Sequence, residues 1–380
     1  MRNWNNAIFI FTILTLSISL IIIPITSNAQ GNPNLNSEAA ILMDRTTGEL
    51  IYEKNADNKM YPASLTKIVT AIIAIETQDL SEIVTVSNKA IRAIGTRVYL
   101  LEDEQVTLEQ LLHGLMVSSG NDAAIAIAEH IDGSVEEFSK RMNQFIKNRI
   151  GVKNSNFSNP HGLYGEDNYT TAKDMALISA YAMGNETFRQ LVSTEFVDWI
   201  GEGWETRIYN HHPLLRAHEE IIGIKNGFIS QSGYTLATAA VVDNTELIVV
   251  TLNSTSRNTA SRDTLALFQF GFENYETQWI SFNEEPLLTN FIFPHDLPYT
   301  TYKEEVLHYT ISEDGYVTIE GDNRIIDIVE LEKREPLHLP NFSFDKIVET
   351  LELQKNQEVN SSPSWKEWLL ITGFYFFIYR

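Results

Sequence analysis

The 380-residue chain contains no cysteine, and this absence removes several kinds of chemistry at once. A thiol nucleophile, a disulfide framework and a thiolate metal site are all excluded. The histidines include the adjacent pair His211-His212, but no His-x-x-x-His or carboxylate spacing accompanies that pair. We therefore expect no metal and no cofactor, and we expect the pair to lie in a solvated loop.

Basic residues are also scarce, with 28 Lys and Arg against 50 Asp and Glu, which gives a formal net charge of −22. Binding of nucleic acid depends on cations that neutralise phosphates, so we expect no nucleic acid partner. The acidic surface instead suits solubility in a salty or anionic setting. It does not prevent binding of a substrate carboxylate, because a few local lysines decide the charge of a buried site.

The N-terminal segment indicates the cellular compartment of the protein, which the absence of cysteine does not determine. A strongly apolar run from Ala7 to Thr26 follows Arg2, and Ser27-Asn28-Ala29 resembles a small-residue cleavage site. We interpret residues 1–29 as a cleaved signal peptide. The alternative is an uncleaved membrane span, since the run approaches the roughly twenty residues that a bilayer requires. Both interpretations predict an exported protein at the extracytoplasmic face of the cell membrane or in the cell wall.

The segment with the most chemical content is Ser64-Leu65-Thr66-Lys67. Pro62 is tolerated at a helix start and not inside a helix, so Ser64 should lie in the first turn. Positions three apart share a helix face, which places the Lys67 amine beside the Ser64 hydroxyl. Lys67 can activate that hydroxyl only when it is neutral, and burial near a second cation such as Lys225 would lower its pKa.

Two later motifs follow in the chain, Ser119-Gly120-Asn121 and Lys225-Asn226-Gly227. A bare Ser-x-x-Lys is common by chance, and an exposed lysine on a helix is its ordinary explanation. The context argues otherwise. The first motif opens a helix, the second lies at a break between two helical stretches, and the third lies in a strand that ends in a turn.

Together the three motifs resemble those of the serine D-alanyl-D-alanine carboxypeptidases, which are low-molecular-mass penicillin-binding proteins of the SxxK acyltransferase group. The similarity runs from about Ser37 to Tyr275. Supporting segments that also resemble the family are Asn159–Leu163, Tyr169–Ala172 and Gly233–Leu236. Two others resemble its spore-associated branch, Ile91–Leu100 and Val249–Asn253.

The resemblance implies a substrate, an inhibitor class and catalytic roles. The substrate would be a peptidoglycan stem peptide that ends in D-Ala-D-Ala, and β-lactams would acylate Ser64 as substrate mimics. Ser64 would attack the carbonyl between the two D-alanines, and Lys67 would accept its proton. Ser119 would relay a proton to the leaving amine. The plainer alternative for Ser119 is a helix N-cap.

The resemblance also implies a substrate-binding set, which is Asn121, Lys225, Asn226, Gly227 and Phe228. Asn121 would orient Lys67 or hold the substrate amide, unless it only caps a helix. Lys225 and Asn226 would hold the terminal carboxylate, unless Lys225 is a surface lysine on an edge strand. Gly227 would let the substrate backbone approach the strand. The backbone N–H groups of Ser64 and Phe228 would form the oxyanion hole.

Asn226 departs from the family pattern, in which the third motif usually reads Lys-Thr-Gly. A threonine hydroxyl donates and accepts at one atom, whereas an asparagine amide does so at two atoms of different reach. Asn226 can still bond a substrate carboxylate. Arg257 or Arg262 could add positive charge there, with a surface role as the alternative.

Two rival functions remain open. A β-lactamase on the same scaffold needs an efficient deacylating base, and Glu166-Asp167-Asn168 lacks the Glu-x-x-Asn pattern of such enzymes. A cell-wall binding protein with a degenerate site is the non-enzymatic alternative, for which Asn226 is the only hint.

The order of elements predicts an α/β (α+β) fold of the penicillin-binding or β-lactamase-like type over residues 37–275. Ala39–Asp44 and Glu49–Lys54 read as a hairpin, helices dominate from Ser64 to Arg149, and strands begin at Ile221. Thr107 with Gln110 and Ser134 with Glu137 have capping-box spacing, and Thr171 with Asp174 opens another helix. Gly133 and Gly151 fit helix ends, and the stretch from Arg262 to Tyr275 reads as a helix. Strands at both ends with helices between them indicate one antiparallel sheet flanked by helices, whose outer strands come from distant parts of the chain.

The remainder of the chain differs in character. Residues 278–353 hold alternating segments that predict a small all-β domain, and residues 354–364 read as a linker. Residues 365–380 are rich in Trp, Tyr and Phe, but as a helix their apolar part would be only about 18 Å long. We expect an amphipathic tail that anchors the protein at a membrane surface. The alternative is a tail packed on the protein or in a partner's groove.

Overall fold

The computed structural model describes residues 31–282, 291–294, 296–322 and 324–333. The helices within these ranges are α2 (Thr66–Thr77), α3 (Asn88–Ile91), α4 (Leu108–Met116), α5 (Asn121–Asp132), α6 (Val135–Phe145), α7 (Ala172–Met183), α8 (Glu186–Ser193) and α9 (Arg257–Asn274). A 3-10 turn, Ala63–Leu65, leads into α2, and a π-helical turn, Ile146–Ile150, follows α6. The strands up to α9 are β1 (Ala39–Asp44), β2 (Leu50–Lys54), β3 (Ile83–Thr85), β4 (Gln105–Thr107), β5 (Phe196–Ile200), β6 (Glu205–Tyr209), β7 (Ile221–Ile229), β8 (Gly233–Val242) and β9 (Thr245–Ser254).

The main sheet is antiparallel and has the strand order β2-β1-β9-β8-β7. The predicted hairpin forms β1 and β2, and β1 also pairs with β9 in the register Ala39↔Leu252. The outer strands β2 and β7 come from distant parts of the chain, as the sequence predicts. Strand β7 is therefore an edge strand of this sheet, and this edge carries the Lys225-Asn226-Gly227 motif.

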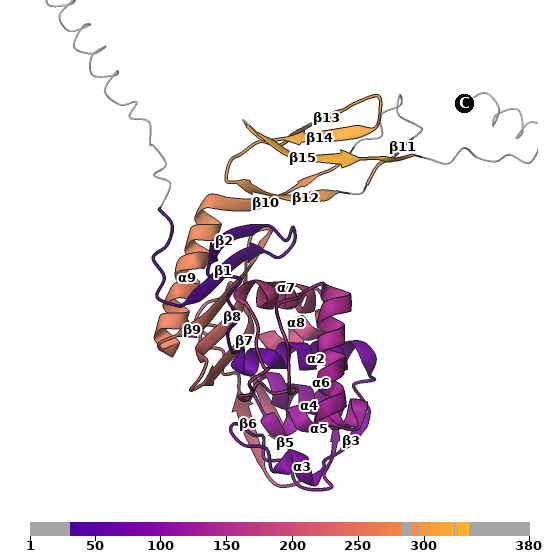
Figure 1. The fold of residues 1–380 in the computed structure, drawn as a ribbon, viewed down its shortest axis with the longest axis vertical. Helices are drawn as coiled ribbons and strands as arrows, with labels where there is room; N and C mark the ends of the chain where they lie inside the picture. The colour runs from indigo at the N-terminus through magenta and orange to yellow at the C-terminus, as the bar shows by residue number, and fades with distance from the viewer. Residues whose placement is uncertain (1–30, 283–290, 295, 323, 334–380) are drawn as a thin grey trace, which may run out of the picture. The chain divides into compact units, whose positions relative to one another are not determined.

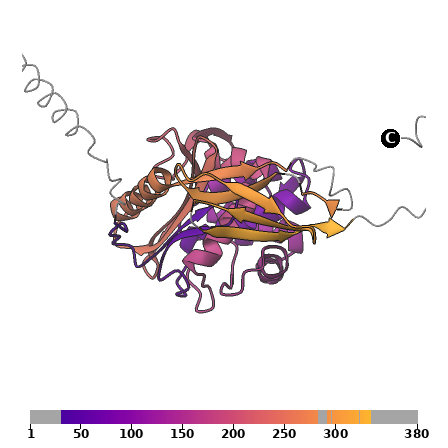
Figure 2. The same cartoon turned by 90° about the horizontal axis from the view of Figure 1, so that it is seen from above.

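Both faces of the sheet are covered because its central strands are apolar on both sides. Ile41 and Val250 pack with the layer of α2, α4, α5 and α7, whereas Leu42 and Val249 pack with α9. This alternation follows from the two-residue period of a strand. Helix α9 stands apart from the other helices in both views (Figures 1 and 2).

Side-chain caps fix the helix starts that the sequence predicts. Thr107, Ser134 and Thr171 each accept a hydrogen bond from the backbone N–H three residues later, at 3.2, 3.1 and 3.0 Å. Gly133 and Gly151 end helical segments at φ 75° and 86°, a conformation that glycine adopts without strain.

Two boundaries differ from expectation. The helix predicted to begin at Arg262 begins at Arg257, because the Ser256 side chain caps it by accepting from Thr259 N at 3.0 Å. The hairpin of β5 and β6 was not predicted, although its strands pair from Phe196↔Tyr209 to Ile200↔Glu205. Trp199 and Ile208 are buried, but Phe196, Ile200 and Tyr209 on the same strands are exposed. The sequence therefore lacks the apolar–polar alternation of a core strand.

Short strands follow α9, and they are β10 (Tyr275–Ile280), β11 (Phe291–Ile292), β12 (Leu297–Tyr302), β13 (His308–Ile311), β14 (Tyr316–Glu320), β15 (Ile325–Glu330) and β16 (Glu332–Lys333). They pair as β10-β12, β11-β16 and β13-β14-β15. The chain divides into two compact units. Among the described residues, the first holds 31–282, 294, 296–310, 317–322 and 324–329. Little of the second is described, chiefly the β11-β16 pair.

Several predictions concern residues that the structure does not describe. The signal peptide at 1–29, the linker at 354–364 and the tail at 365–380 all lie outside the described residues, and so does much of the domain predicted at 278–353. Among the helices that are described, none combines the length and the apolar character needed to cross a bilayer.

Candidate active site

Ser64 and Lys67 meet where the 3-10 turn Ala63–Leu65 enters α2. Ser64 is half-buried, and Lys67 is completely buried. The Lys67 Nζ lies 3.1 Å from the Ser64 Oγ. The same nitrogen donates to the Asn121 Oδ1 at 2.7 Å and to the His161 carbonyl at 2.8 Å. The amine is thus held against the hydroxyl by two neutral acceptors.

The electrostatic environment favours the neutral form of Lys67. Burial, and then the nearby positive charge of Lys225, hold the pKa of Lys67 well below its usual value, while Asp122 opposes this shift. A neutral amine can accept a proton, and a protonated one cannot. The pKa is displaced in the direction, and by the two causes, that the sequence predicts.

The segment Asn159–Leu163 packs against the turn and helix that carry Ser64 and Lys67. Its carbonyls bond the first turns of α2, because Thr70 Oγ1 donates to the Pro160 carbonyl at 2.7 Å and Lys67 donates to the next one. Gly162 has φ 87°, and a Cβ there would lie 1.8 Å from the Ala63 carbonyl oxygen. Only glycine fits this position, which the sequence analysis did not single out as a site residue.

Ser119 sits at the break between α4 and α5, as predicted. Its backbone is left-handed at φ 61°, and the residue is only 7% exposed. The N-cap of α5 is Gly120, and no side chain caps this helix start. The alternative that Ser119 serves as a helix cap is therefore wrong. A non-glycine residue in this conformation is strained and tends to occur at functional sites.

Asn121 binds two partners that fix its position. Its Oδ1 accepts from Lys67, and its Nδ2 donates to the Ile94 carbonyl at 2.7 Å. Of the two roles predicted for Asn121, the structure shows the contact needed to orient Lys67. Its side chain does not cap α5, because the cap position is Gly120.

Asp122 supports the site and was missed by the sequence analysis. It is fully buried, and its carboxylate accepts from Val98 N at 3.0 and 3.1 Å and from Leu100 N at 3.3 Å. Burial raises the pKa of Asp122, and the backbone N–H groups oppose that rise. The available signal was a single acidic residue inside the apolar helix run that follows Asn121.

Lys225 is 1% exposed, so the alternative of a surface lysine on an edge strand is wrong. Burial lowers the pKa of Lys225 to about 7. Its Nζ contacts the Asn226 carbonyl at 3.0 Å and the Asn226 Oδ1 at 3.4 Å. Because the amide oxygen of Asn226 faces the lysine, its Nδ2 is the atom left to donate to a carboxylate.

Gly227 is required for a reason beyond the predicted approach of a substrate backbone. A Cβ at Gly227 would lie 2.7 Å from the backbone N of Ser64 and 2.6 Å from Thr235 Oγ1. The strand therefore runs directly beside the nucleophile. Phe228 follows Gly227, and its side chain is 53% exposed. The placement brings the backbone at residues 227–228 next to the Ser64 N–H, as an oxyanion hole requires.

The prediction of a solvated loop is wrong for one residue of the histidine pair. His212 is 3% exposed, and its Nε2 lies 3.0 Å from Thr238 Oγ1. Burial and then the Lys225 charge lower the pKa of His212 to about 3. His211 is exposed, and its pKa falls to about 4 through partial burial and then the charges of Lys225 and Arg257.

An electrostatic effect on His211 distinguishes the two arginines considered from the sequence. Arg257 acts on the same imidazole as Lys225, so it lies on the side of the sheet edge that carries the third motif. Arg262 is 65% exposed and lies 3.9 Å from Asp263. In the described part of the chain, no cluster of three or more His, Asp or Glu residues could hold a metal ion.

A family profile described as D-alanyl-D-alanine carboxypeptidase matches residues 26–256. The chain is 29% identical to the D-alanyl-D-alanine carboxypeptidase DacF of Bacillus subtilis (strain 168) over 354 residues, covering 90% of this chain and 88% of that protein. It is 32% identical to the D-alanyl-D-alanine carboxypeptidase DacA of Haemophilus influenzae over 266 residues, covering 64% of each chain. It thus spans just under two thirds of that second relative.

The fold is also shared with a solved structure. Penicillin binding protein 5 from Haemophilus influenzae superposes with a TM-score of 0.70 at 26% identity, covering 80% of this chain and 98% of the other. This likeness confirms the predicted mixed α/β fold, with its antiparallel sheet, flanking helices and additional β segment.

Proposed function

The chain belongs to the D-alanyl-D-alanine carboxypeptidase family, and from this premise we propose that it removes the terminal D-alanine from peptidoglycan stem peptides through an acyl-enzyme on Ser64. The reaction needs neither a metal nor a cofactor, because a lysine supplies the base.

Acylation begins with proton transfer from Ser64 to Lys67. The neutral Lys67 amine, 3.1 Å from the Ser64 Oγ, takes the hydroxyl proton as the oxygen attacks the carbonyl carbon between the two D-alanines. The backbone N–H groups of Ser64 and Phe228 receive the negative charge that develops on the carbonyl oxygen. Asn121 holds the resulting ammonium through its Oδ1.

The tetrahedral intermediate collapses with loss of D-alanine. The proton on Lys67 passes through the Ser119 hydroxyl to the leaving amine, which breaks the C–N bond and leaves an ester on Ser64. A water molecule then attacks the ester carbonyl while Lys67 accepts one of its protons. That proton returns to the Ser64 oxygen, which frees the shortened peptide and restores the enzyme.

Recognition of the C-terminal carboxylate falls to Lys225 and Asn226. In the described chain, the hydrogen-bond partners of the Lys225 ammonium include no carboxylate. A substrate carboxylate would supply that missing charge, and the Asn226 Nδ2 would add a hydrogen bond. Arg257 contributes positive charge at longer range.

The single observation that carries this proposal is the buried Lys67 amine bonded to Ser64 and Asn121 with a lowered pKa. A buried lysine with a purely structural role normally pairs with a carboxylate, whereas Lys67 contacts a hydroxyl and two neutral oxygens. A residue so perturbed beside a nucleophile is a mark of catalysis.

The test measures release of D-alanine from a diacetyl-L-Lys-D-Ala-D-Ala peptide by the wild type and by Ser64→Ala. We expect release by the wild type only. Mass spectrometry after exposure to benzylpenicillin should find one adduct, on Ser64, that hydrolyses slowly. Rapid turnover of the penicillin would indicate a β-lactamase, and absence of both release and adduct would indicate a wall-binding protein.

We further propose that the protein acts outside the cytoplasm, in maturation of the cell wall. The apolar segment at 1–29 supports export, and the aromatic tail at 365–380 supports contact with the membrane surface. The family resemblance at Ile91–Leu100 favours a role in the spore cortex. Fractionation of cells that express the full chain and the chain ending at residue 364 tests the tail, because only the full chain should sediment with membranes.

A further inference from the structure

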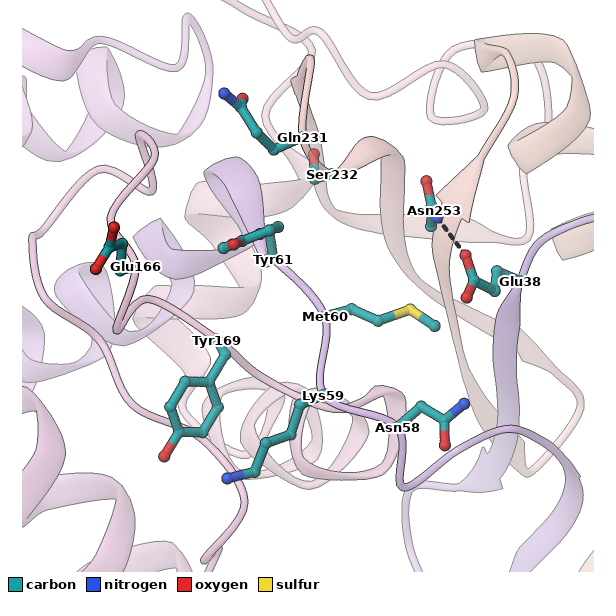
Figure 3. A pocket seen from close by; sticks show the side chains of 10 residues that line it. All are labelled: Glu38, Asn58, Lys59, Met60, Tyr61, Glu166, Tyr169, Gln231, Ser232 and Asn253. Atoms are coloured by element: carbon teal, nitrogen blue, oxygen red, sulfur yellow. Dashed lines mark hydrogen bonds between the residues drawn. The ribbon is translucent and has the colours of Figure 1, made fainter.

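A cavity of about 560 Å³ lies beside the segment that leads into the nucleophile (Figure 3). Its lining residues are polar, charged or aromatic, apart from one methionine, and they are Glu38, Asn58, Lys59, Met60, Tyr61, Glu166, Tyr169, Gln231, Ser232 and Asn253. None of them belongs to the three motifs of the catalytic site, so the reaction described above leaves this cavity without a role.

The walls of the cavity are continuous with the catalytic site. Tyr61 precedes Ser64 by three residues, and the Pro62 carbonyl between them accepts from Thr235 Oγ1 at 3.2 Å. Gln231 and Ser232 form the turn that follows β7. The cavity therefore opens at the end of the edge strand that carries the third motif.

The geometry of an edge strand sets where the substrate would run. An extended peptide can add to β7, since this strand has a neighbour on only one side in the described sheet. With its carboxylate at Lys225 and its scissile carbonyl at Ser64, the peptide would continue toward the turn at Gln231. At about 3.3 Å per residue, the stem residue before the two D-alanines lies roughly 3–7 Å beyond the scissile bond. Its side chain can then enter the cavity.

The charges on the wall of the cavity are of both signs. Figure 3 shows Lys59, Tyr169 and Glu166 along one side and the Glu38–Asn253 pair on the other. Lys59 Nζ lies over the Tyr169 ring at 4.1 Å from its centroid, and Glu38 accepts from Asn253. In the described part of the chain, neither Lys59 nor Glu166 forms a salt bridge.

We propose that this cavity selects the stem residue before the two D-alanines, an inference that rests on the proposed function. The cavity takes a side chain that ends in both an ammonium and a carboxylate. Glu166 pairs with the ammonium and Lys59 with the carboxylate. Diaminopimelate has both groups at the end of its side chain, whereas lysine has the ammonium alone. The cavity therefore favours diaminopimelate stems over lysine stems.

The experiment compares two peptides that end in D-Ala-D-Ala and differ only in having diaminopimelate or lysine before it. For the full chain we expect kcat/KM for D-alanine release to be about three- to tenfold higher with diaminopimelate, the range of a partly screened ion pair. Lys59→Met should remove this preference and leave the lysine peptide within about twofold of wild type. Glu166→Gln should lower kcat/KM for both peptides.

The matched control is Lys140→Met on α6, which removes a lysine that pairs with Glu137 on the surface. It should leave the preference intact. Binding of the two peptides to Ser64→Ala, measured by calorimetry, gives a readout that does not require turnover. Equal affinity for both peptides, or a preference that survives in Lys59→Met, would overturn the inference. Lack of turnover with a preserved difference in binding would instead count against the proposed function alone.

Discussion

Two of the regions of the first compact unit that bury titratable side chains differ in the surroundings of those side chains. The catalytic site buries the amines of Lys67 and Lys225 near one another, and the buried Asp122 carboxylate acts on Lys67. The region where β1 and the N-terminal segment meet α9 and β10 buries two anions, Asp44 and Asp263. The two amines have lowered pKa values and hydrogen-bond to neutral oxygens, whereas each of the two carboxylates accepts several hydrogen bonds.

The anions join segments that are distant in the sequence. Asp263 accepts from Asn36 N at 2.8 Å, from Ser37 N at 2.6 Å and from Ser37 Oγ at 2.7 Å. Asp44 accepts from Thr277 Oγ1 at 2.7 Å and from Thr300 Oγ1 at 2.9 Å. A buried carboxylate with several donors can stabilise a fold, while a buried amine that hydrogen-bonds only to neutral oxygens costs free energy when it is protonated, so its presence points to chemistry.

The largest effect should follow from Lys67→Arg. Arginine keeps the positive charge and cannot lose its proton, so it cannot serve as the base. We expect D-alanine release to fall by roughly a thousandfold or more, as it does when one member of a catalytic unit is removed. The measurement is kcat for the diacetyl-L-Lys-D-Ala-D-Ala peptide. An arginine variant that retained a tenth of the activity would show that a charged residue at this position suffices.

The second-largest effect should follow from Asp263→Ala, and it concerns the free energy of unfolding. Asp263→Ala leaves the N–H groups of Asn36 and Ser37 without their acceptor, although Ser37 Oγ keeps Ser254 Oγ as a partner, so the free energy of unfolding should fall by about 3 kcal/mol. Urea unfolding measures the change. The control is Asp198→Ala, which removes an exposed carboxylate bonded to Arg207 and should leave stability unchanged. Equal effects of the two changes would remove the distinction between buried and exposed anions.

A pH series tests the neutral imidazole beside the cations. His212 has a folded pKa of about 3 and an ordinary unfolded value, so the unfolded chain binds a proton first as the pH falls below about 6.5. Stability is therefore lost on acidification. Between pH 7 and 4.5 the wild type should lose about 2–3 kcal/mol more than His212→Gln, which keeps a polar partner for Thr238. Parallel stability curves for the two proteins would contradict a neutral His212.

The smallest effect should come from Lys225→Met, and it has opposite signs for function and stability. Loss of the carboxylate partner should raise KM for the peptide by about tenfold. Removal of a buried charge should raise the free energy of unfolding by about 1–2 kcal/mol at pH 6. Because the folded pKa of Lys225 is about 7 and the unfolded value is higher, wild-type stability rises above pH 7 and the gain should shrink. A destabilised variant at pH 6 would show that this cation supports the fold.

Features that depend on local sequence could be predicted, and features that depend on close approach could not. The helix starts at Thr107 and Ser134, the hairpin of β1 and β2 and the three motifs follow from spacing and capping chemistry. Gly162 and Asp122 gave no comparable signal, because their roles arise from backbone atoms far away in the chain.

The burial of His212 shows the same limit. A pair of histidines after a polar strand reads as a surface loop, but β8 places Thr238 beside His212 and covers it. Gly227 is an intermediate case. A glycine in a strand indicates a close approach, but the sequence does not say that the approaching atoms belong to the nucleophile's own turn.

The pairing of β1 with β9 constrains the order in which this protein can mature. Residues 39–44 occupy an interior position in the sheet, and one of their two partners is residues 247–252. The main sheet therefore cannot close until some 250 residues have been synthesised, and pairing across such a separation is intrinsically slow. A fragment that ends before β9 would lack the strand that joins β1 to β8, so its first hairpin would have no place in the main sheet.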